Sequence, residues 1–146
     1  MSIIKEINQK DIELCCELDS STISLWSKTQ WDNEFKKEGI KVYGLSISSF
    51  IVGICVLQVV VDEAHINYFA VKKKFQRQGV GSNIMNYLIA YCEKLKINKL
   101  LLEVSELNSA ANEFYSHFDF RTVGKRKNYY KDGSDALLKE KILIKK

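Results

Sequence analysis

The feature that most constrains this chain is a short apolar strand that leads into a basic, glycine-containing loop and then into an amphipathic helix. It spans residues 69–82 and has the sequence FAVKKKFQRQGVGS. Glycine lets a backbone approach a ligand closely, and the first turn of a helix offers unpaired N–H groups with a partial positive charge. Together with lysine and arginine side chains, such a turn can bind phosphate oxygens. We therefore expect this segment to bind the pyrophosphate of a cofactor.

The glycine pair Gly79 and Gly81 is a weak signal by itself, because many turns after strands contain two glycines at this spacing. The segment is not a dinucleotide fingerprint, since the third glycine is absent, and it is not a P-loop, which ends in Gly-Lys-Ser or Gly-Lys-Thr. The prediction depends on the whole context of strand, basic loop and helix.

The bulk properties predict an ordinary globular domain. A chain of 146 residues is long enough for one domain with a substantial core, and we expect that domain to cover residues 1–146. A net charge of +4 suits an anionic cofactor and does not by itself predict nucleic-acid binding. The longest apolar run, residues 50–61, is too short to cross a bilayer, and the first residues lack the pattern of a signal peptide. We expect a soluble, cytoplasmic protein that binds neither membranes nor nucleic acid.

The cysteines and histidines do not predict a metal site. Neither Cys15, Cys16, Cys55 nor Cys92 forms a CxxC pair, and the two histidines add no zinc-ligand spacing. We expect reduced, mostly buried thiols and no metal.

Hydrophobic periodicity predicts a mixed α/β domain of the α+β type. The first half is predicted to contain a strand at 2–7, helices at 11–19 and 31–37, and three antiparallel strands at 41–48, 50–61 and 64–71. The second half is predicted to contain a helix at 79–95, a strand at 99–104, a helix around 111–118 capped by Asn108 or Ser109, and strands at 120–126 and 136–144. Asp11 is the expected cap of the first helix.

Several motifs resemble one known family. Residues 76–81, QRQGVG, fit the Q/R-x-x-G-x-G/A element of the GNAT N-acetyltransferases, and the predicted order of elements resembles that family from end to end. Within residues 59–130, VVVDEAHINYFAV, LLEVSELNSAANEFY and RKNYY resemble the bacterial ribosomal-protein-alanine N-acetyltransferases. Lys73 stands where the family commonly has proline, and Asp119 where it favours glycine, although aspartate tolerates a left-handed helix end moderately well. The resemblance implies a mainly antiparallel central sheet flanked by helices.

The resemblance also implies a binding site for acetyl-coenzyme A. The backbone of residues 69–71 would contact the acetyl and pantetheine part, where an N–H aimed at the thioester oxygen could stabilise the oxyanion. Residues 76–82 would hold the pyrophosphate, and Asn108 matches a further cofactor contact. The implied cofactor-binding residues are Phe69, Ala70, Val71, Gln76, Arg77, Gln78, Gly79, Val80, Gly81, Ser82 and Asn108.

Glu103 is the candidate catalytic base. Its carboxylate interrupts the apolar strand LLLEV, where a charge is costly unless it faces a cleft or has a partner. The alternative is a glutamate on the strand surface that pairs with a lysine. We favour the catalytic role, which the resemblance also implies, because a carboxylate can take the proton of an amine directly or through one water.

Tyr115 is the candidate acid that protonates the departing thiolate. Taken alone, its spacing from Phe114 and Phe118 favours simple core packing, since aromatic stripes on helices are usually core. The resemblance gives Tyr115 the role of the matching family tyrosine. Cys55 and Cys92 have no activating neighbour in the sequence, so we expect direct transfer in a ternary complex rather than a covalent acyl intermediate.

The residues that would bind the acceptor have more than one interpretation. The basic aromatic run at 125–131 has the composition of a nucleic-acid patch, whereas the resemblance implies that Tyr129 and Tyr130 line a peptide entrance. It further implies acetylation of the N-terminal alanine of a small-subunit ribosomal protein, whose basic N-terminal segment would be the partner. A lysine side chain, a polyamine or another small amine is the alternative acceptor, and a non-catalytic acetyl-coenzyme A sensor is the alternative function.

Overall fold

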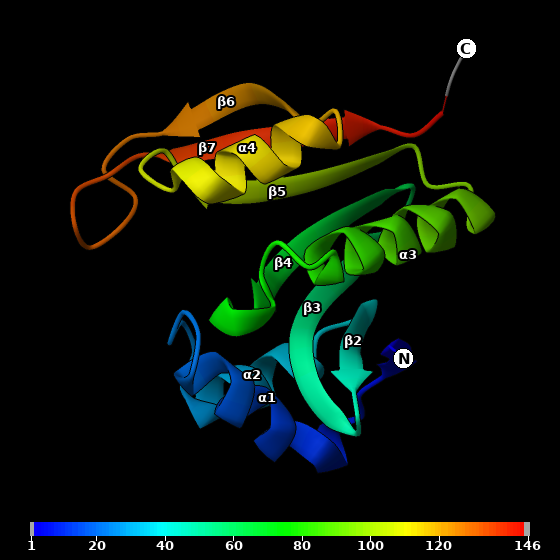
Figure 1. The fold of residues 1–146 in the computed structure, drawn as a ribbon. Helices are drawn as coiled ribbons and strands as arrows, with labels where there is room; N and C mark the ends of the chain where they lie inside the picture. The colour runs from blue at the N-terminus through cyan, green and yellow to red at the C-terminus, as the bar shows by residue number, and fades with distance from the viewer. Residues whose placement is uncertain (1, 145–146) are drawn as a thin grey trace.

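The computed structural model describes residues 2–144, which form a single seven-stranded sheet in the order β1-β2-β3-β4-β5-β7-β6 (Figure 1). The strands are β1 (Ser2–Glu6), β2 (Ile40–Ile47), β3 (Phe50–Val60), β4 (Glu63–Val71), β5 (Lys99–Ser105), β6 (Arg121–Arg126) and β7 (Ala136–Ile142). The helices are α1 (Ile12–Ser20), α2 (Lys28–Phe35), α3 (Val80–Lys94) and α4 (Ser109–His117), with short 3-10 turns η1 (Gln9–Asp11) and η2 (Lys73–Phe75). Within these residues β4 and β5 pair in parallel and the other neighbours are antiparallel, which confirms the predicted mainly antiparallel sheet.

The central strand β3 is apolar because helices cover both of its faces. Ile54 and Val56 pack with buried residues of α1 and α2, while Cys55 and Leu57 pack with those of α3 and α4. Figure 1 shows α3 and α4 on one side of the sheet and α1 and α2 on the other. Successive side chains of a strand point to opposite faces, so a strand buried on both sides needs no polar alternation. The predicted helix–sheet–helix arrangement is confirmed.

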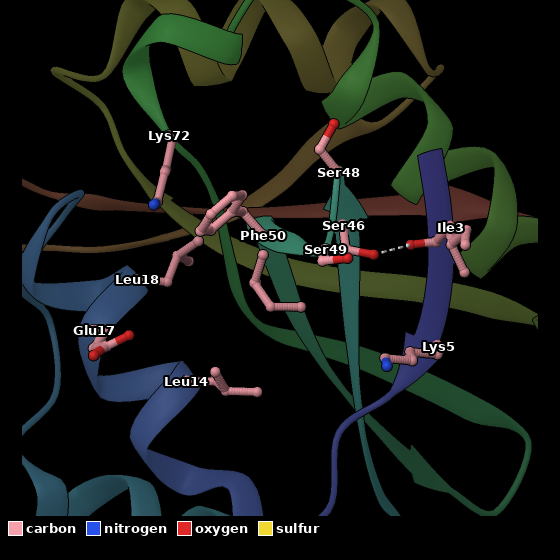
Figure 2. A pocket seen from close by; sticks show the side chains of 11 residues that line it. Ile3, Lys5, Leu14, Glu17, Leu18, Ser46, Ser48, Ser49, Phe50 and Lys72 are labelled. Atoms are coloured by element: carbon pink, nitrogen blue, oxygen red, sulfur yellow. Dashed lines mark hydrogen bonds between the residues drawn. The ribbon is translucent and has the colours of Figure 1, made fainter. Parts of the chain in front are cut away.

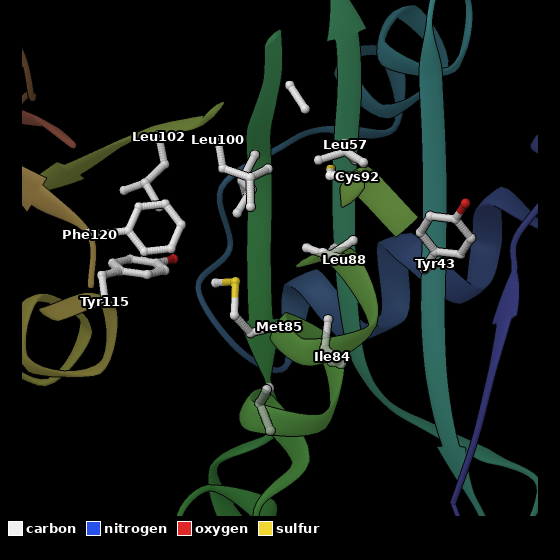
Figure 3. Packing of buried hydrophobic residues seen from close by; sticks show 14 of the residues in the cluster. Tyr43, Leu57, Ile84, Met85, Leu88, Cys92, Leu100, Leu102, Tyr115 and Phe120 are labelled. Atoms are coloured by element: carbon white, nitrogen blue, oxygen red, sulfur yellow. The ribbon is translucent and has the colours of Figure 1, made fainter. Parts of the chain in front are cut away.

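Helix α3 packs the larger core cluster through its apolar stripe (Figure 3). Ile84, Met85 and Leu88 are at most 2% exposed, as expected for residues at helical spacing. The sequence pattern also placed Leu95 in this stripe, which is wrong. Leu95 is 46% exposed because the helix ends at Lys94 and the chain then turns through a left-handed residue, Lys96.

Two helix starts differ from the sequence prediction. Helix α2 begins at Lys28, three residues earlier than predicted, because the Ser27 hydroxyl accepts a bond from the Gln30 N–H and the Gln30 side chain accepts one from the Ser27 N–H. This capping box starts the helix before its apolar stripe begins. Asp11 precedes α1 but makes no side-chain capping bond, since η1 comes before it. Asp119 does adopt the left-handed conformation expected after α4, with φ +65°.

A β-bulge in β4 shapes the middle of the sheet. Val56 pairs with Tyr68 and the next residue of β3 pairs with Ile66, so Asn67 is the extra residue. A bulge bends its strand and increases the local twist. The parallel pairing of β4 with β5 stops after Ile66 and Leu102, although both strands continue, and Figure 1 shows them diverging. The last part of β4 therefore has no strand partner on its β5 side.

Candidate active site

A hollow of about 530 Å³ lies where β4 and β5 diverge, on the α1 and α2 side of the sheet. It brings together three predicted site residues, Glu103, Tyr129 and Tyr130. We call it the acceptor hollow; its lining residues are Leu25, Trp26, Glu34, Lys37, His65, Ile66, Asn67, Leu101, Leu102, Glu103, Val123, Arg126, Tyr129, Tyr130, Leu138 and Lys139. Its walls thus come from the α1–α2 loop and α2, from β4 and β5, and from the β6–β7 hairpin.

Glu103 faces the acceptor hollow from β5. Its neighbours Leu102 and Val104 belong to the core cluster under α3 and α4, and strand alternation turns Glu103 to the opposite face. The Arg126 Nε donates to Glu103 Oε1 at 3.1 Å, and the glutamate side chain is 33% exposed. An ion-pair partner was the expected alternative to a catalytic role, and here the partner is an arginine rather than a lysine. Glu103 is therefore both ion-paired and open to the hollow.

Tyr115 is the buried residue of α4 and lies on the other side of the sheet. Its ring packs against Phe69, Phe114 and Phe120 at centroid distances of 6.3, 5.4 and 5.6 Å. Figure 3 shows it beside Phe120 and Leu102, with its hydroxyl turned away from the helix backbone. Burial raises the pKa of the Tyr115 hydroxyl, so the phenol stays protonated at neutral pH. The predicted core packing is real, and the same packing keeps the hydroxyl available as a proton donor.

Burial is the main cause that raises the pKa of Tyr130, and the negative charge of Glu103 adds to it. Burial is likewise the main cause that raises the pKa of Tyr115, and the nearby Cys55 and Tyr130 side chains add to it.

The predicted phosphate loop has an open helix start. Gly79 is the residue before α3 and adopts a left-handed φ of +82°, and no side chain caps the helix. A helix start without a side-chain cap leaves first-turn N–H groups free for an anion. The side-chain amides of Gln76 and Gln78 donate to the carbonyls of Val71 and Lys74 at 3.0 and 2.8 Å. These glutamines hold the shape of the loop, so the loop offers its backbone to a ligand.

Gly81 permits a close approach between α3 and α4. A Cβ at this position would lie 3.3 Å from the Phe114 ring and 3.8 Å from that of Phe69. The first of these distances is tighter than ordinary van der Waals contact, so a side chain would push the ring away. Because Phe69 and Phe114 also flank Tyr115, the glycine links the phosphate loop to the candidate acid.

Asn108 caps α4, as the sequence predicted. Its Oδ1 accepts a bond from the Ala111 N–H at 3.1 Å, which leaves the amide nitrogen for a ligand. The Asn112 amide donates to the carbonyls of Ser105 and Asn108 at 3.0 and 2.8 Å and so fixes the loop that carries this cap.

A separate hollow of about 350 Å³ lies between α1 and the first strands (Figure 2). Leu14 and Leu18 of α1 face Phe50 across it, and Lys5 and Lys72 lie at its edge. It contains none of the predicted catalytic or cofactor residues. The acceptor hollow is therefore the candidate active site.

Sequence reasoning missed the wall of the acceptor hollow that comes from residues 25–37. Trp26 lies between the helices predicted at 11–19 and 31–37, and no motif of the sequence marks Glu34. Asn67 was counted as an ordinary strand residue. Nothing in the periodicity marks it as a bulge, because a bulge depends on how the partner strand pairs.

The described residues were also considered for metal ligands and for helices long enough to cross a membrane. Among residues 2–144 no group of three or more histidine, cysteine or acidic side chains is arranged to hold a metal ion. Within the same range, every helix is too short or too polar to cross a bilayer.

The sheet opens between a parallel strand pair, the start of α3 has no side-chain cap, and a carboxylate and a phenol lie on the two faces of the sheet. A family model described as the acetyltransferase (GNAT) domain matches residues 7–140. The chain belongs to the GNAT acetyltransferase family, which confirms the resemblance.

Individual proteins agree with this assignment. The ribosomal protein bS18-alanine N-acetyltransferase of Haemophilus influenzae is 32% identical over 133 residues, covering 89% of this chain and 88% of the relative. The crystal structure of the ribosomal-protein-S18-alanine N-acetyltransferase from Escherichia coli superposes with a TM-score of 0.93 at 27% identity, covering 100% and 96% of the two chains. A GNAT family acetyltransferase from Elizabethkingia anophelis with acetyl-CoA bound shares the fold, with a TM-score of 0.80 at 22% identity over 97% and 98%.

Proposed function

We propose that this protein transfers the acetyl group of acetyl-coenzyme A to the α-amine of an N-terminal alanine in a small-subunit ribosomal protein. The observation that carries the proposal is that Glu103 lines the acceptor hollow while Tyr115, in the core on the other side of the sheet, packs against Phe69 near the end of β4. The similarity to bS18-alanine N-acetyltransferases supports the choice of acceptor. A ribosomal-protein acceptor implies that the reaction takes place in the cytoplasm.

The proposed cofactor residues follow from the resemblance, and the geometry of the loop supports them. The open start of α3 and the loop at 76–82 would bind the pyrophosphate, and the Asn108 side-chain amide would make a further cofactor contact. The unpaired edge of β4 at 69–71 would hold the thioester in the opening, where a backbone N–H can stabilise the oxyanion. Acetyl-coenzyme A supplies the activated acyl group.

The acid and base complete the transfer. Glu103 takes a proton from the acceptor ammonium or amine, directly or through one water, as the N–C bond forms. The C–S bond then breaks, and the Tyr115 hydroxyl donates a proton to the leaving sulfur. An α-amine has a pKa of about 7.7–8.0 against about 10.4 for lysine, so a single carboxylate suffices for the first proton at neutral pH.

The thiols support direct transfer. Burial raises the pKa of Cys55 to about 12 and, with a smaller contribution from Glu93, that of Cys92 to about 11. A protonated, buried thiol is a poor nucleophile. Attack by the acceptor amine on the thioester in a ternary complex therefore needs no cysteine.

Tyr129 and Tyr130 are proposed to line the peptide entrance. Their rings meet edge to face at 5.1 Å, and the Arg126 guanidinium lies 5.9 Å from the centre of the Tyr129 ring. Tyr129 is 55% exposed, so its ring can contact an incoming peptide backbone.

An acceptor panel tests the proposal. We would measure coenzyme A release with a peptide that begins with alanine, the same peptide with a blocked N-terminus and one internal lysine, and spermidine. Acetylation of the free α-amine alone, verified by mass spectrometry, is the expected result. Preference for the lysine or for spermidine would move the acceptor to a side-chain or polyamine amine, and cofactor binding without turnover on any amine would indicate a sensor.

A further inference from the structure

The two buried acids of residues 2–144 have no part in the proposed chemistry. Asp19 of α1 is 2% exposed and Glu34 of α2 is 5% exposed. Burying a carboxylate is costly unless hydrogen bonds or a cation compensate for lost water. Both acids are compensated, and the partners they use lie at one place in the fold.

Asp19 ties the α1–α2 loop to β4. Its Oδ1 accepts bonds from the Leu25 N–H and the Tyr68 hydroxyl, and its Oδ2 accepts one from the Trp26 N–H, each at 2.9 Å. The Trp26 ring packs on Tyr68 at 5.1 Å and on Trp31 at 4.7 Å. Leu25 and Trp26 line the acceptor hollow, so one carboxylate fixes that wall.

Glu34 makes the matching contact one residue earlier in β4. Its Oε2 accepts a bond from the Asn67 amide at 2.7 Å, and its Oε1 pairs with Lys37 Nζ at 2.7 Å. The same Asn67 amide donates to the Gln58 side chain of β3 at 3.1 Å. Glu34 and Asn67 both line the acceptor hollow.

The two acids therefore hold two consecutive residues of the bulge, Asn67 and Tyr68. A bulge turns both side chains toward the same helices, whereas strand alternation would send them to opposite faces. The next residue, Phe69, begins the segment proposed to carry the thioester. We infer that Asp19 and Glu34 are positioning residues that set the distance between the acceptor wall and the thioester strand.

This inference rests on the proposed function, because the wall is an acceptor wall only if an amine enters the hollow. Stability alone does not account for the acids well. Buried ion pairs and carboxylates can often be replaced by apolar groups of similar size without loss of stability. Geometry does account for them, since a misplacement of about 1 Å between reacting groups can cost about 10²-fold in rate.

The test compares variants that break each contact with variants that keep its shape. Glu34→Ala removes the acceptor of the Asn67 bond, and Glu34→Gln keeps an oxygen in its place. Asp19→Asn and Tyr68→Phe each alter the second contact. Glu13→Gln is the matched control, since Glu13 is an exposed acid of α1 that pairs with Lys28 at 2.7 Å.

For each variant we would measure the KM of the acceptor peptide, kcat, and the Kd of acetyl-coenzyme A by calorimetry. We expect Glu34→Ala and Asp19→Asn to lower kcat/KM for the peptide about ten-fold or more, with the Kd of acetyl-coenzyme A within about two-fold of wild type. Glu34→Gln should recover most of that loss. Folded variants with an unchanged kcat/KM for the peptide, or a parallel loss of acetyl-coenzyme A affinity, would overturn the inference.

Failure of the proposed function gives a different result. If the wild type does not acetylate the alanine peptide, the acceptor assignment is wrong, and hydrogen exchange then tests whether Asp19 positions the wall of the hollow. Loss of protection at the Leu25 and Trp26 amides in Asp19→Asn supports this positioning role, and unchanged protection contradicts it.

Discussion

The two sides of the opening between β4 and β5 are built differently. On the α3 and α4 side, one continuous segment at 69–82 presents backbone groups, and its side-chain amides are used to hold the loop. On the α1 and α2 side, the hollow is assembled from side chains that are far apart in sequence, among them Trp26, Glu34, Glu103 and Tyr130. A backbone site suits a ligand that is the same in every reaction, whereas a side-chain site can be changed residue by residue to suit an acceptor.

The largest effect is expected from removing the base on the acceptor side. Glu103→Gln keeps the shape of the side chain and removes its ability to take a proton. General-base catalysis contributes about 10²–10⁴-fold, so kcat at pH 7 should fall by that order. The Kd of acetyl-coenzyme A, measured by calorimetry, should not change. Glu113→Gln is the control, because Glu113 is an exposed residue of α4; an equally active Glu103→Gln would remove the assigned mechanism.

The next effect tests the acid on the cofactor side through its pH dependence. The raised pKa of Tyr115 means that its phenol stays protonated until well above its ordinary pKa of about 10. Deprotonation of Tyr115 should therefore cause no fall in wild-type kcat between pH 7 and pH 9.5. Tyr115→Phe should lower kcat about ten-fold or more at every pH, without changing the shape of the profile.

A wild-type rate that falls through pH 8 to 9, with the fall absent in Tyr115→Phe, would contradict this reading of the burial. The same shift affects stability. Because the pKa of Tyr115 is higher in the folded state than in the unfolded state, its contribution to the free energy of unfolding falls only as the pH rises above about 10.

A smaller effect tests the packing between the phosphate loop and α4. Gly81→Ala places a Cβ 3.3 Å from the Phe114 ring, which must move. We expect the KM of acetyl-coenzyme A to rise about three- to ten-fold, while the KM of the peptide stays close to that of wild type. Gly81→Ala combined with Phe114→Leu provides the room and should restore part of the affinity. A change confined to the peptide KM would contradict the assignment of the cofactor to the α3 and α4 side and of the acceptor to the α1 and α2 side.

The smallest effect is expected from Arg126→Gln. The Arg126 side chain is 56% exposed, and exposed ion pairs are worth about 0–1 kcal/mol, so the melting temperature should hardly change. Loss of the cation frees Glu103 Oε1 for the acceptor, and the peptide KM should fall by less than about five-fold. A fall in kcat as large as that of Glu103→Gln would instead make Arg126 part of the catalytic machinery.

The difference between the two sides also explains which parts of the fold and of the site could be predicted from the sequence. The order of elements follows from local pattern, which also offers Asn108 as one of two possible caps of α4. The mainly antiparallel sheet and the left-handed helix end at Asp119 are implied by the resemblance, and the structure has all of these features. Glu103 and Tyr115 are candidates because a charge within an apolar strand and a family motif can both be recognised in the sequence. Their place on opposite faces depends on strand and helix packing.

The acceptor wall could not be predicted in the same way. Glu34 and Asn67 look like surface residues in sequence, and they become a pair only because a bulge turns Asn67 toward α2. The early start of α2 is an intermediate case, because the Ser27 and Gln30 capping box that starts the helix consists of neighbouring residues, whereas the apolar pattern begins only at Trp31.

In the proposed mechanism the acetyl group is transferred through the opening between β4 and β5, and a crystal structure of the protein with acetyl-coenzyme A would test this. We expect the thioester beside residues 69–71, with Glu103 on one side and the Tyr115 hydroxyl within hydrogen-bonding distance of the sulfur on the other. A thioester that lies outside this opening, with Glu103 and Tyr115 remote from it, would contradict the mechanism.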